Sequence, residues 1–258
     1  MEFEHVRIVL VGTTHPGNIG ATARAMHTMG LQQLCLVDPQ CDPRDDAAVA
    51  RAARAEAILE QATQHATLAA ALSGCQRVYG LSARPRAERY LVNDLRTAAL
   101  GSAALRAQAE ATGRAEWAEQ AWIFGRERTG LSNAELDHCH ELVHIPTNPY
   151  YSSLNVASAV QLVAWELRMA HHAPHALTGG TGPYPSHSTP ATVDTLERFF
   201  DHLEQTATTV GYLERQNPEL TMRRLRNIFR RAALGEDEVR MLRGLLSHIL
   251  DSRRWKKR

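Results

Sequence analysis

Short apolar runs rich in β-branched residues alternate with helical patterns over most of the chain, and this alternation most narrows its possible folds. The apolar runs lie at 6–11, 34–37, 77–81, 121–124 and 142–145. Helical patterns lie around 19–30, 46–73, 132–140 and 154–171, while the alanine-rich stretch 98–118 fits either a helix or an irregular segment. Such alternation predicts a parallel sheet covered by helices on both faces. Because ligands of these sheets bind beyond the carboxyl ends of the strands, the loops after the strands are the candidate sites.

Residues 191–258 have a different, all-helical pattern. Apolar residues at 196, 199, 200 and 203 follow helical spacing after Thr189-Pro190, which we expect to be an N-cap and a first-turn proline. Two more apolar helical faces centre on 225–229 and 239–249. The stretch 173–190 is rich in Pro and Gly and has no apolar period, as a linker would. The predicted organisation is an α/β domain at 1–172, a linker at 173–190 and a small helical domain at 191–258.

Composition argues against several classes of protein. No apolar run reaches the roughly 20 residues of a membrane helix, and the acidic start Met1-Glu2-Phe3-Glu4 is unlike a signal peptide. The 4 cysteines include no CxxC pair, and the histidines at 138–144 lack the spacing of zinc ligands. We therefore expect a cytoplasmic protein with no membrane segment, no disulfide and no metal site.

Charge is unevenly distributed although the totals, 29 basic and 28 acidic residues, nearly cancel. Residues 191–258 hold 14 Lys or Arg and 10 Asp or Glu, a net charge of +4. Within them, Arg223, Arg226 and Arg230 share one face at helical spacing, which we expect to be exposed and opposite Leu225 and Phe229. The alternative is that these arginines only form a solvent-exposed helix face and bind nothing. A basic helical appendage favours a module that grips RNA phosphates.

Three loops after predicted strands carry unusual residue patterns. The first, 12–26, joins strand to helix through glycines and suits an anion, but it is neither a P-loop nor GxGxxG. Arg24 follows Gly20 by one helical turn, a position from which it can point back to the loop. The second, 124–132, brackets three charged residues between glycines and ends in a capping box, and the third, 145–156, gathers hydroxyl side chains before a helix. Each loop also has a purely structural interpretation. The first would be a tight turn, the second a polar loop with an exposed Arg-Glu pair, and the third a set of helix-capping residues.

Together these loops resemble, in order and spacing, the three motifs of the SPOUT methyltransferases. The matching segments are Asn18-Ile-Gly-Ala-Thr-Ala-Arg24, Phe124-Gly-Arg-Glu-Arg-Thr-Gly-Leu131 and Ile145-Pro with Ser152-Ser-Leu-Asn-Val156. The chain is most similar to the TrmJ branch, bacterial tRNA 2′-O-methyltransferases that act on nucleotide 32 of the anticodon loop. The likeness runs nearly end to end and includes Ser82-Ala83-Arg84, 202–206 and 242–245, but it is poor over 46–66.

The resemblance implies a parallel sheet with a C-terminal trefoil knot, S-adenosylmethionine as cofactor, tRNA as partner and a homodimer. Leu81 departs from the family, whose members carry threonine there. The cofactor-binding residues would be Leu81, Ser82, Ala83, Gly125, Glu127, Ile145, Ser152, Ser153 and Leu154. The catalytic residues would be Arg24, Ser153 and Asn155, and the RNA would contact Asn18, Arg24, Arg223, Arg226 and Arg230.

Two functions from different classes fit these features. One is an S-adenosylmethionine-dependent RNA ribose methyltransferase, and the other is a non-catalytic RNA-binding protein that kept the fold. Intact Arg24, Glu127, Ser153 and Asn155 favour the enzyme. A nicotinamide-binding enzyme is a third interpretation, but the chain lacks its glycine fingerprint and acidic ribose ligand.

Overall fold

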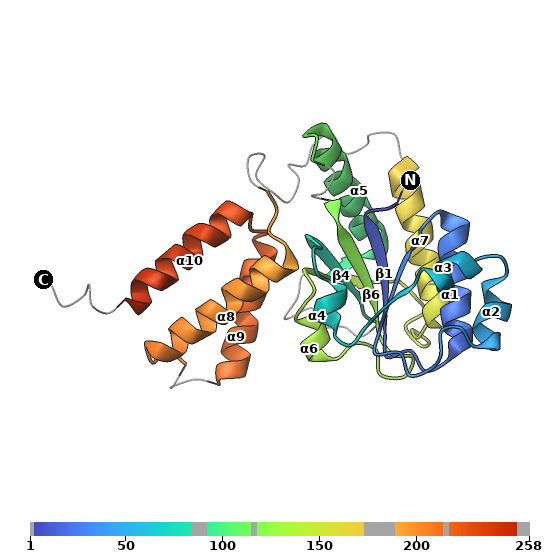
Figure 1. Ribbon diagram of the computed structural model, residues 1–258, viewed down its shortest axis with the longest axis horizontal. Helices are drawn as coiled ribbons and strands as arrows, with labels where there is room; N and C mark the ends of the chain where they lie inside the picture. The colour runs from blue at the N-terminus through green and yellow to red at the C-terminus, as the bar shows by residue number, and fades with distance from the viewer. Residues whose placement is uncertain (1–2, 84–91, 115–117, 173–188, 214–216, 252–258) are drawn as a thin grey trace, which may run out of the picture.

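The computed structural model describes residues 3–83, 92–114, 118–172, 189–213 and 217–251. Figure 1 shows a sheet with helices on both sides and, beside it, a separate lobe of helices from the end of the chain. Among the described residues, no helix has the length and apolar character needed to cross a bilayer. The linker 173–190 falls almost entirely outside the described residues, as do Arg84 and the basic tail from 252.

A parallel sheet forms the centre of the larger part. Every pairing between the described strands is parallel, and the strand order is β3-β2-β1-β6-β4-β7-β5. The strands are β1 (Val6–Val11), β2 (Gln33–Val37), β3 (Thr63–His65), β4 (Arg77–Leu81), β5 (Val92–Asp94), β6 (Gln120–Phe124) and β7 (Glu141–His144).

Helices cover this sheet on both faces. One face carries α1 (Pro16–Met29), α2 (Asp46–Ala52), α3 (Glu56–Glu60), α5 (Leu95–Ala111) and α7 (Val156–His172). The opposite face carries the short helices α4 (Leu68–Ala71) and α6 (Asn133–Leu136). Alternate residues of one strand enter different cores: Ile8 joins the cluster under α1 and α7, whereas Val9 joins the cluster under α4 and α6. The two-residue period of a strand produces this division, since successive side chains leave opposite faces.

The five strands and the parallel sheet expected from the sequence are confirmed. Two edge strands, β3 and β5, were missed because each has only three residues and β3 is polar. The prediction of one helical stretch over 46–73 was therefore wrong, since β3 interrupts three short helices there. The ambiguous stretch 98–118 is largely helix α5, which begins at the Asp94 cap.

The described C-terminal residues form α8 (Val193–Thr209), α9 (Pro218–Arg231) and α10 (Glu236–Leu250). Leu196, Phe199 and Phe200 are buried in their shared core, as their spacing predicted. The expected start at Thr189-Pro190 was wrong: Thr192 caps α8, and Pro190 instead bridges to Gly235. This lobe contacts the sheet domain directly, because Asp194 accepts hydrogen bonds from Ser73 Oγ (2.9 Å) and the Gly74 amide (3.0 Å).

Arg223, Arg226 and Arg230 of α9 do not form the exposed face that the sequence suggested. Arg226 and Arg230 point inward to the two carboxylate oxygens of Glu197 on α8, at 2.5 and 2.6 Å, and both guanidinium groups lie over the ring of Phe200. Arg230 is only 3% exposed. Arg223 pairs with Asp137, just after α6, at 2.8 Å. Helical spacing correctly placed the three on one face but could not show that this face packs against acidic partners.

Candidate active site

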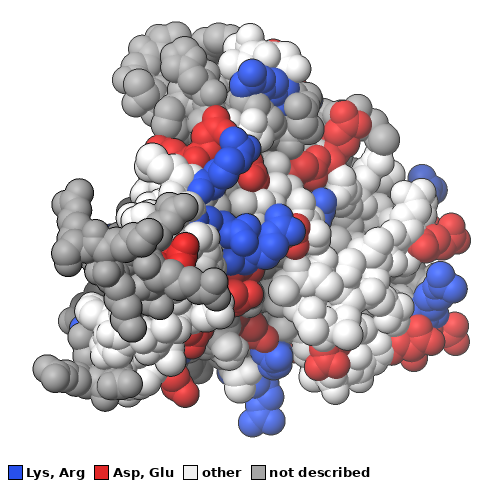
Figure 2. Space-filling model, turned by 60° about the vertical axis from the view of Figure 1, so that its left-hand side comes forward, with Lys and Arg blue, Asp and Glu red and all other residues white. Residues whose placement is uncertain are grey.

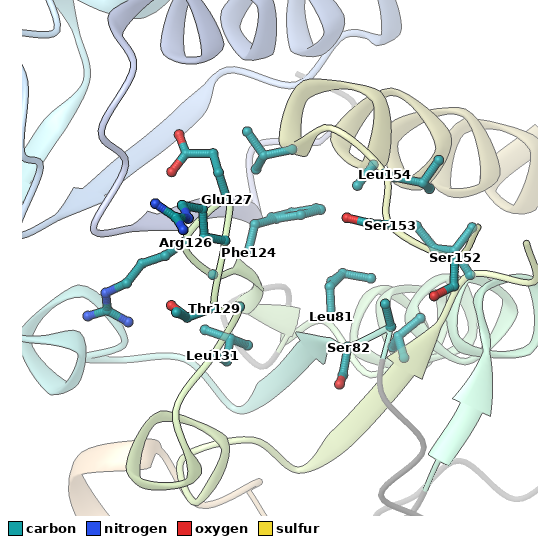
Figure 3. Close-up of a pocket in the computed structure, with 18 residues that line it drawn as sticks. Leu81, Ser82, Phe124, Arg126, Glu127, Thr129, Leu131, Ser152, Ser153 and Leu154 are labelled. Carbon is teal, nitrogen blue, oxygen red and sulfur yellow. The ribbon is translucent and has the colours of Figure 1, made fainter. Parts of the chain in front are cut away.

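A cavity of about 320 Å³ opens where β4, β6 and β7 end. Its wall comes from the loops that follow these strands and from the start of α7, so it lies where ligands of parallel sheets bind. All nine residues predicted to bind the cofactor line it, from Leu81 to Leu154. Figure 3 shows the Ser153 hydroxyl pointing across the cavity toward the ring of Phe124.

The loop after β6 forms one wall and is tightly folded. Arg126 and Gly130 exchange backbone hydrogen bonds across its base. A Cβ atom on Gly125 would lie 2.2 Å from the carbonyl carbon of Gly130, so no larger residue fits without moving the loop. The Arg126 guanidinium pairs with Glu135 at 2.9 Å, and Glu135 forms the predicted capping box with Ser132 at the start of α6. The loop is thus held in shape by α6.

One hydrogen-bond chain joins the three sequence motifs. The amide nitrogen of Asn18 on α1 donates to Glu127 Oε1 at 3.0 Å, and its oxygen accepts from Asn155 Nδ2 at 3.0 Å. The Asn155 oxygen in turn accepts from the Ala157 amide at 2.9 Å and so caps α7. Asn18 was expected to contact RNA, but the nitrogen and the oxygen of its side-chain amide both form hydrogen bonds within the protein. Its observed role is to fix Glu127 relative to Asn155.

Glu127 is a negatively charged group in the cavity wall. Burial raises its pKa, but hydrogen bonds from Asn18 and from the amide and hydroxyl of Thr14 outweigh that effect, and the pKa is lowered overall. The carboxylate is therefore ionised at neutral pH.

The remaining wall divides into apolar and hydroxyl-bearing parts. Leu81, Phe124, Ile145 and Leu154 provide the apolar surface, with hydroxyl groups from Ser82, Ser152, Ser153 and Thr129 around them. The Ser82 amide donates to Val143 O at 3.1 Å, which ties the end of β4 to β7. An apolar slot with a few placed polar groups is the usual form of a small-molecule site.

Comparison with known proteins identifies the family. Residues 5–165 match the model of the SpoU rRNA Methylase family, and residues 194–258 match that of the tRNA methyltransferase TrmJ C-terminal domain. The chain belongs to the SpoU methylase family. The family model ends within α7, and the second model covers the lobe of α8 to α10.

Individual members of this family resemble the whole chain. A protein of Klebsiella pneumoniae named tRNA (cytidine/uridine-2'-O-)-methyltransferase TrmJ is 44% identical over 251 residues, 95% of this chain and 96% of its own. The crystal structure of TrmJ from Z. mobilis ZM4 superposes with a TM-score of 0.78 at 30% identity, covering 95% of this chain and 99% of that one. A probable methylase family protein of Haemophilus influenzae gives a TM-score of 0.61 at 38% identity, with both chains fully covered. These likenesses place the chain in the TrmJ branch of the family.

Arg24, which the family resemblance suggested as catalytic, lies apart from the cavity wall. It is exposed on α1, and its backbone oxygen accepts from Thr28 at 2.8 Å. Among the described residues its guanidinium has no ion-pair partner. Because α1 turns about 100° per residue, Arg24 points in a different direction from Asn18.

Several wall residues were not predicted individually. Phe124, Arg126 and Thr129 line the cavity, and Thr14 supports Glu127 from behind. The first three lie within the loop that the charge and glycine pattern singled out, so a signal was present. Thr14 lies in the first loop that the sequence singled out, but its contact with Glu127 had no signal, because it depends on how closely the first loop approaches the second.

Proposed function

We propose that this protein is an S-adenosylmethionine-dependent tRNA 2′-O-methyltransferase that modifies cytidine or uridine at position 32 of the anticodon loop, in the cytoplasm. The observation that carries the proposal is the cavity, since every residue expected to bind the methyl donor lines it. Relatives that match nearly the whole chain bear the name of this activity.

The chemistry of the cavity fits the methyl donor. Its volume, about 320 Å³, is within the ~300–1,000 Å³ range of small-molecule pockets. Apolar side chains from Leu81, Ile145 and Leu154 suit an adenine ring, and the serine hydroxyls suit ribose oxygens. The ionised carboxylate of Glu127 suits a cationic ligand. When bound there, S-adenosylmethionine supplies an electrophilic methyl group.

The chain itself must aim the ribose hydroxyl and relieve it of a proton. Ser153 projects into the cavity, where its hydroxyl is placed to orient the bound groups. Asn155 is held in position by Asn18 and by its cap of α7, so we assign it to positioning at the same site. Arg24, with no carboxylate competing for it among the described residues, pairs with an RNA phosphate and so orients the 2′-hydroxyl.

Nucleoside analysis tests this function. tRNA from a strain that lacks the protein should lack one 2′-O-methylated nucleoside, which purified protein with S-adenosylmethionine should restore. Restoration at a nucleotide other than 32 would contradict the proposed position. Binding of tRNA with no binding of S-adenosylmethionine by calorimetry would instead support the non-catalytic RNA-binding protein.

We infer a homodimer from an apolar stripe on α7. Leu162, Trp165 and Met169 are 39%, 48% and 40% exposed and lie on one face of this helix. Exposed apolar groups at helical spacing suit a second copy of the same face, because two-fold interfaces are self-complementary. Sedimentation should show a dimer that Trp165→Glu converts to monomer, and a monomeric wild type would contradict this.

We also infer that the chain divides into a domain at 1–172, a linker at 173–190 and a domain at 191–258. We further infer that the sheet is knotted. β4 and β5 follow one another in the chain, yet β7 lies between them, and the chain then continues to α7, which packs on α1 and α5. A β4–β5 connection that crosses the end of β7 would leave 145–155 threaded through it. Residues 84–91 lie outside those described, and a crystal structure that traces them clear of 145–155 would contradict the knot.

A further inference from the structure

The groove between α8 and α10 carries arginines that the methyltransferase chemistry leaves unused. It has a volume of about 320 Å³ and lies in the C-terminal lobe. On α10, Arg240, Arg243, Gly244 and Ser247 fall on one face at i, i+3, i+4 and i+7, and Arg198 faces them from α8. The groove therefore presents positive charge on the surface of the lobe, whereas Arg226 and Arg230 of α9 are engaged in ion pairs with Glu197.

These three arginines are weakly engaged within the protein. Arg198 donates to the neutral hydroxyl of Thr195 at 3.3 Å. Arg240 pairs with Asp237 at 2.8 Å, but both side chains are exposed, 77% and 67%, and such surface pairs contribute little. Arg243 is exposed and has no ion-pair partner among the described residues. All three can thus turn to an external anion at little cost, unlike Arg226 and Arg230.

The acidic residue in the groove wall does not cancel this charge. Glu236 lines the groove, but its carboxylate accepts a hydrogen bond from the Thr192 amide at 3.3 Å, which directs one oxygen toward the start of α8. Even with Asp237 counted beside Arg240, three arginines against two carboxylates leave the groove with an excess of positive charge. Figure 2, which turns the C-terminal helices toward the viewer, shows basic side chains gathered in the middle of that face with acidic ones beside them.

Gly244 is the second observation that points to a ligand. It lies in the interior of α10, where a glycine makes the helix less stable than an alanine would. Nothing lies within 4 Å of the position its Cβ would take, and its φ is not in the left-handed region, so neither packing nor backbone conformation requires it. What the missing side chain does is leave the groove open between Arg240 and Ser247, and glycine commonly permits such close approach of a ligand.

We propose that the α8–α10 groove binds the phosphate backbone of the substrate tRNA through Arg198, Arg240 and Arg243, with Gly244 allowing the strand to approach α10. This rests on the proposed function, which makes tRNA the substrate. On α10, Arg240 and Arg243 are about 4.5 Å apart along the helix axis at 1.5 Å per residue, and Arg198 faces them from α8. Charges presented by two helices suit successive phosphates of a strand better than one small anion.

The first test compares two double variants of the full-length chain that lose the same charge. Arg240→Gln with Arg243→Gln changes the groove, and Arg224→Gln with Arg231→Gln changes exposed arginines of α9 in the same lobe. Affinity for an unmodified tRNA transcript is measured by fluorescence anisotropy over a KCl series. The groove variant should bind at least tenfold more weakly, with a salt dependence shallower by about 1–2 in log–log slope. The α9 variant should bind within about threefold of wild type.

A glycine pair provides the second test. Gly244→Gln fills the groove without changing charge, and Gly101→Gln makes the same change at an exposed, uncrowded glycine inside α5. Both variants should melt at or above the wild-type temperature, because glutamine favours helix. Only Gly244→Gln should weaken tRNA binding, by about fivefold or more, while calorimetry shows unchanged S-adenosylmethionine binding.

The outcomes separate the groove from the enzyme's function. If wild type binds tRNA and the groove variants bind equally well, or no worse than their matched controls, the groove assignment is wrong while the proposed function stands. If wild type itself binds no tRNA, both fall together.

Discussion

Arg24 is the residue whose role tests the proposed chemistry most directly. A guanidinium gives up its proton only reluctantly, so we assign Arg24 to pairing with a phosphate and not to acting as a base. Arg24→Lys keeps the charge but loses the two-pronged donor geometry. Its kcat should fall roughly a hundredfold, as misplaced reacting groups do, with S-adenosylmethionine affinity unchanged by calorimetry. Arg24→Ala should be at least as impaired.

A matched control is Arg44→Lys, in an exposed loop before α2. Near-normal turnover of the lysine variant at Arg24 would show that charge alone suffices. Near-normal turnover of the alanine variant would remove Arg24 from the mechanism.

Gly125 tests the shape of the cavity wall. An alanine Cβ there would lie 2.2 Å from Gly130 and 2.3 Å from the Leu131 amide nitrogen, so the loop must move. We expect Gly125→Ala to cost about 1–3 kcal/mol of unfolding free energy through overpacking. S-adenosylmethionine affinity should fall at least tenfold, measured by calorimetry beside urea unfolding. Unchanged affinity would mean that this loop does not touch the cofactor, and Gly101→Ala serves as the unstrained control.

At the scale of elements, the carboxylate of Glu197 holds α8 and α9 together. Burial raises its pKa, but the charges of Arg230 and Arg226 outweigh that effect and the pKa is lowered overall, so the group is ionised between two cations. Glu197→Gln leaves Arg230 buried without a counter-charge, which typically costs about 3–5 kcal/mol. Urea unfolding should show this loss, and Glu204→Gln, on the exposed side of the same helix, should change stability by less than about 0.5 kcal/mol.

If Glu197→Gln proves as stable as wild type, the inward arrangement of the α9 arginines is wrong, and the exposed phosphate-binding face expected from the sequence returns. The contact between Arg223 and Asp137 extends this acidic–basic interface to the sheet domain. Through α6, the same domain supports the cavity loop by the pair of Arg126 and Glu135.

At the scale of the whole molecule, buried histidines make stability depend on pH. Burial, with nearby arginine charge, lowers the pKa of His5 to about 4 and that of His140 well below its usual value. His140 Nδ1 accepts a hydrogen bond from the Val78 amide in β4, so it is neutral in the folded protein. An unfolded histidine binds a proton below about pH 6.5. Between pH 6.5 and 4 the unfolded chain therefore holds more protons, and stability rises with pH.

We expect the unfolding free energy to drop by about 1.4 kcal/mol per pH unit for each such histidine below pH 6.5. Chemical denaturation from pH 7.5 to 5 should show this slope. His140→Asn, which keeps an acceptor for the Val78 amide, should remove the share of this slope that His140 contributes and leave that of His5, whereas His27→Asn on the exposed side of α1 should not change the slope. A stability that is constant over this range would contradict the neutral, buried state of His140.

The sequence by itself determined most of the elements and nine of the residues that line the cavity. Periodicity located five strands, since a buried strand needs consecutive apolar residues, and the loops after three of them proved to line one cavity. The capping box at Ser132 and Glu135 was also readable, because it depends on residues three apart. Such features are local, so the chain's own spacing specifies them.

Only the tertiary structure decided what each face meets. It put β6 between β1 and β4, added two short edge strands, and turned Arg226 and Arg230 inward onto Glu197. It also engaged both ends of the Asn18 amide, with Glu127 and Asn155 more than a hundred residues away. Helical spacing assigns side chains to a face, but whether that face meets solvent or a carboxylate depends on elements distant in sequence. That choice is made by the packing of the whole chain.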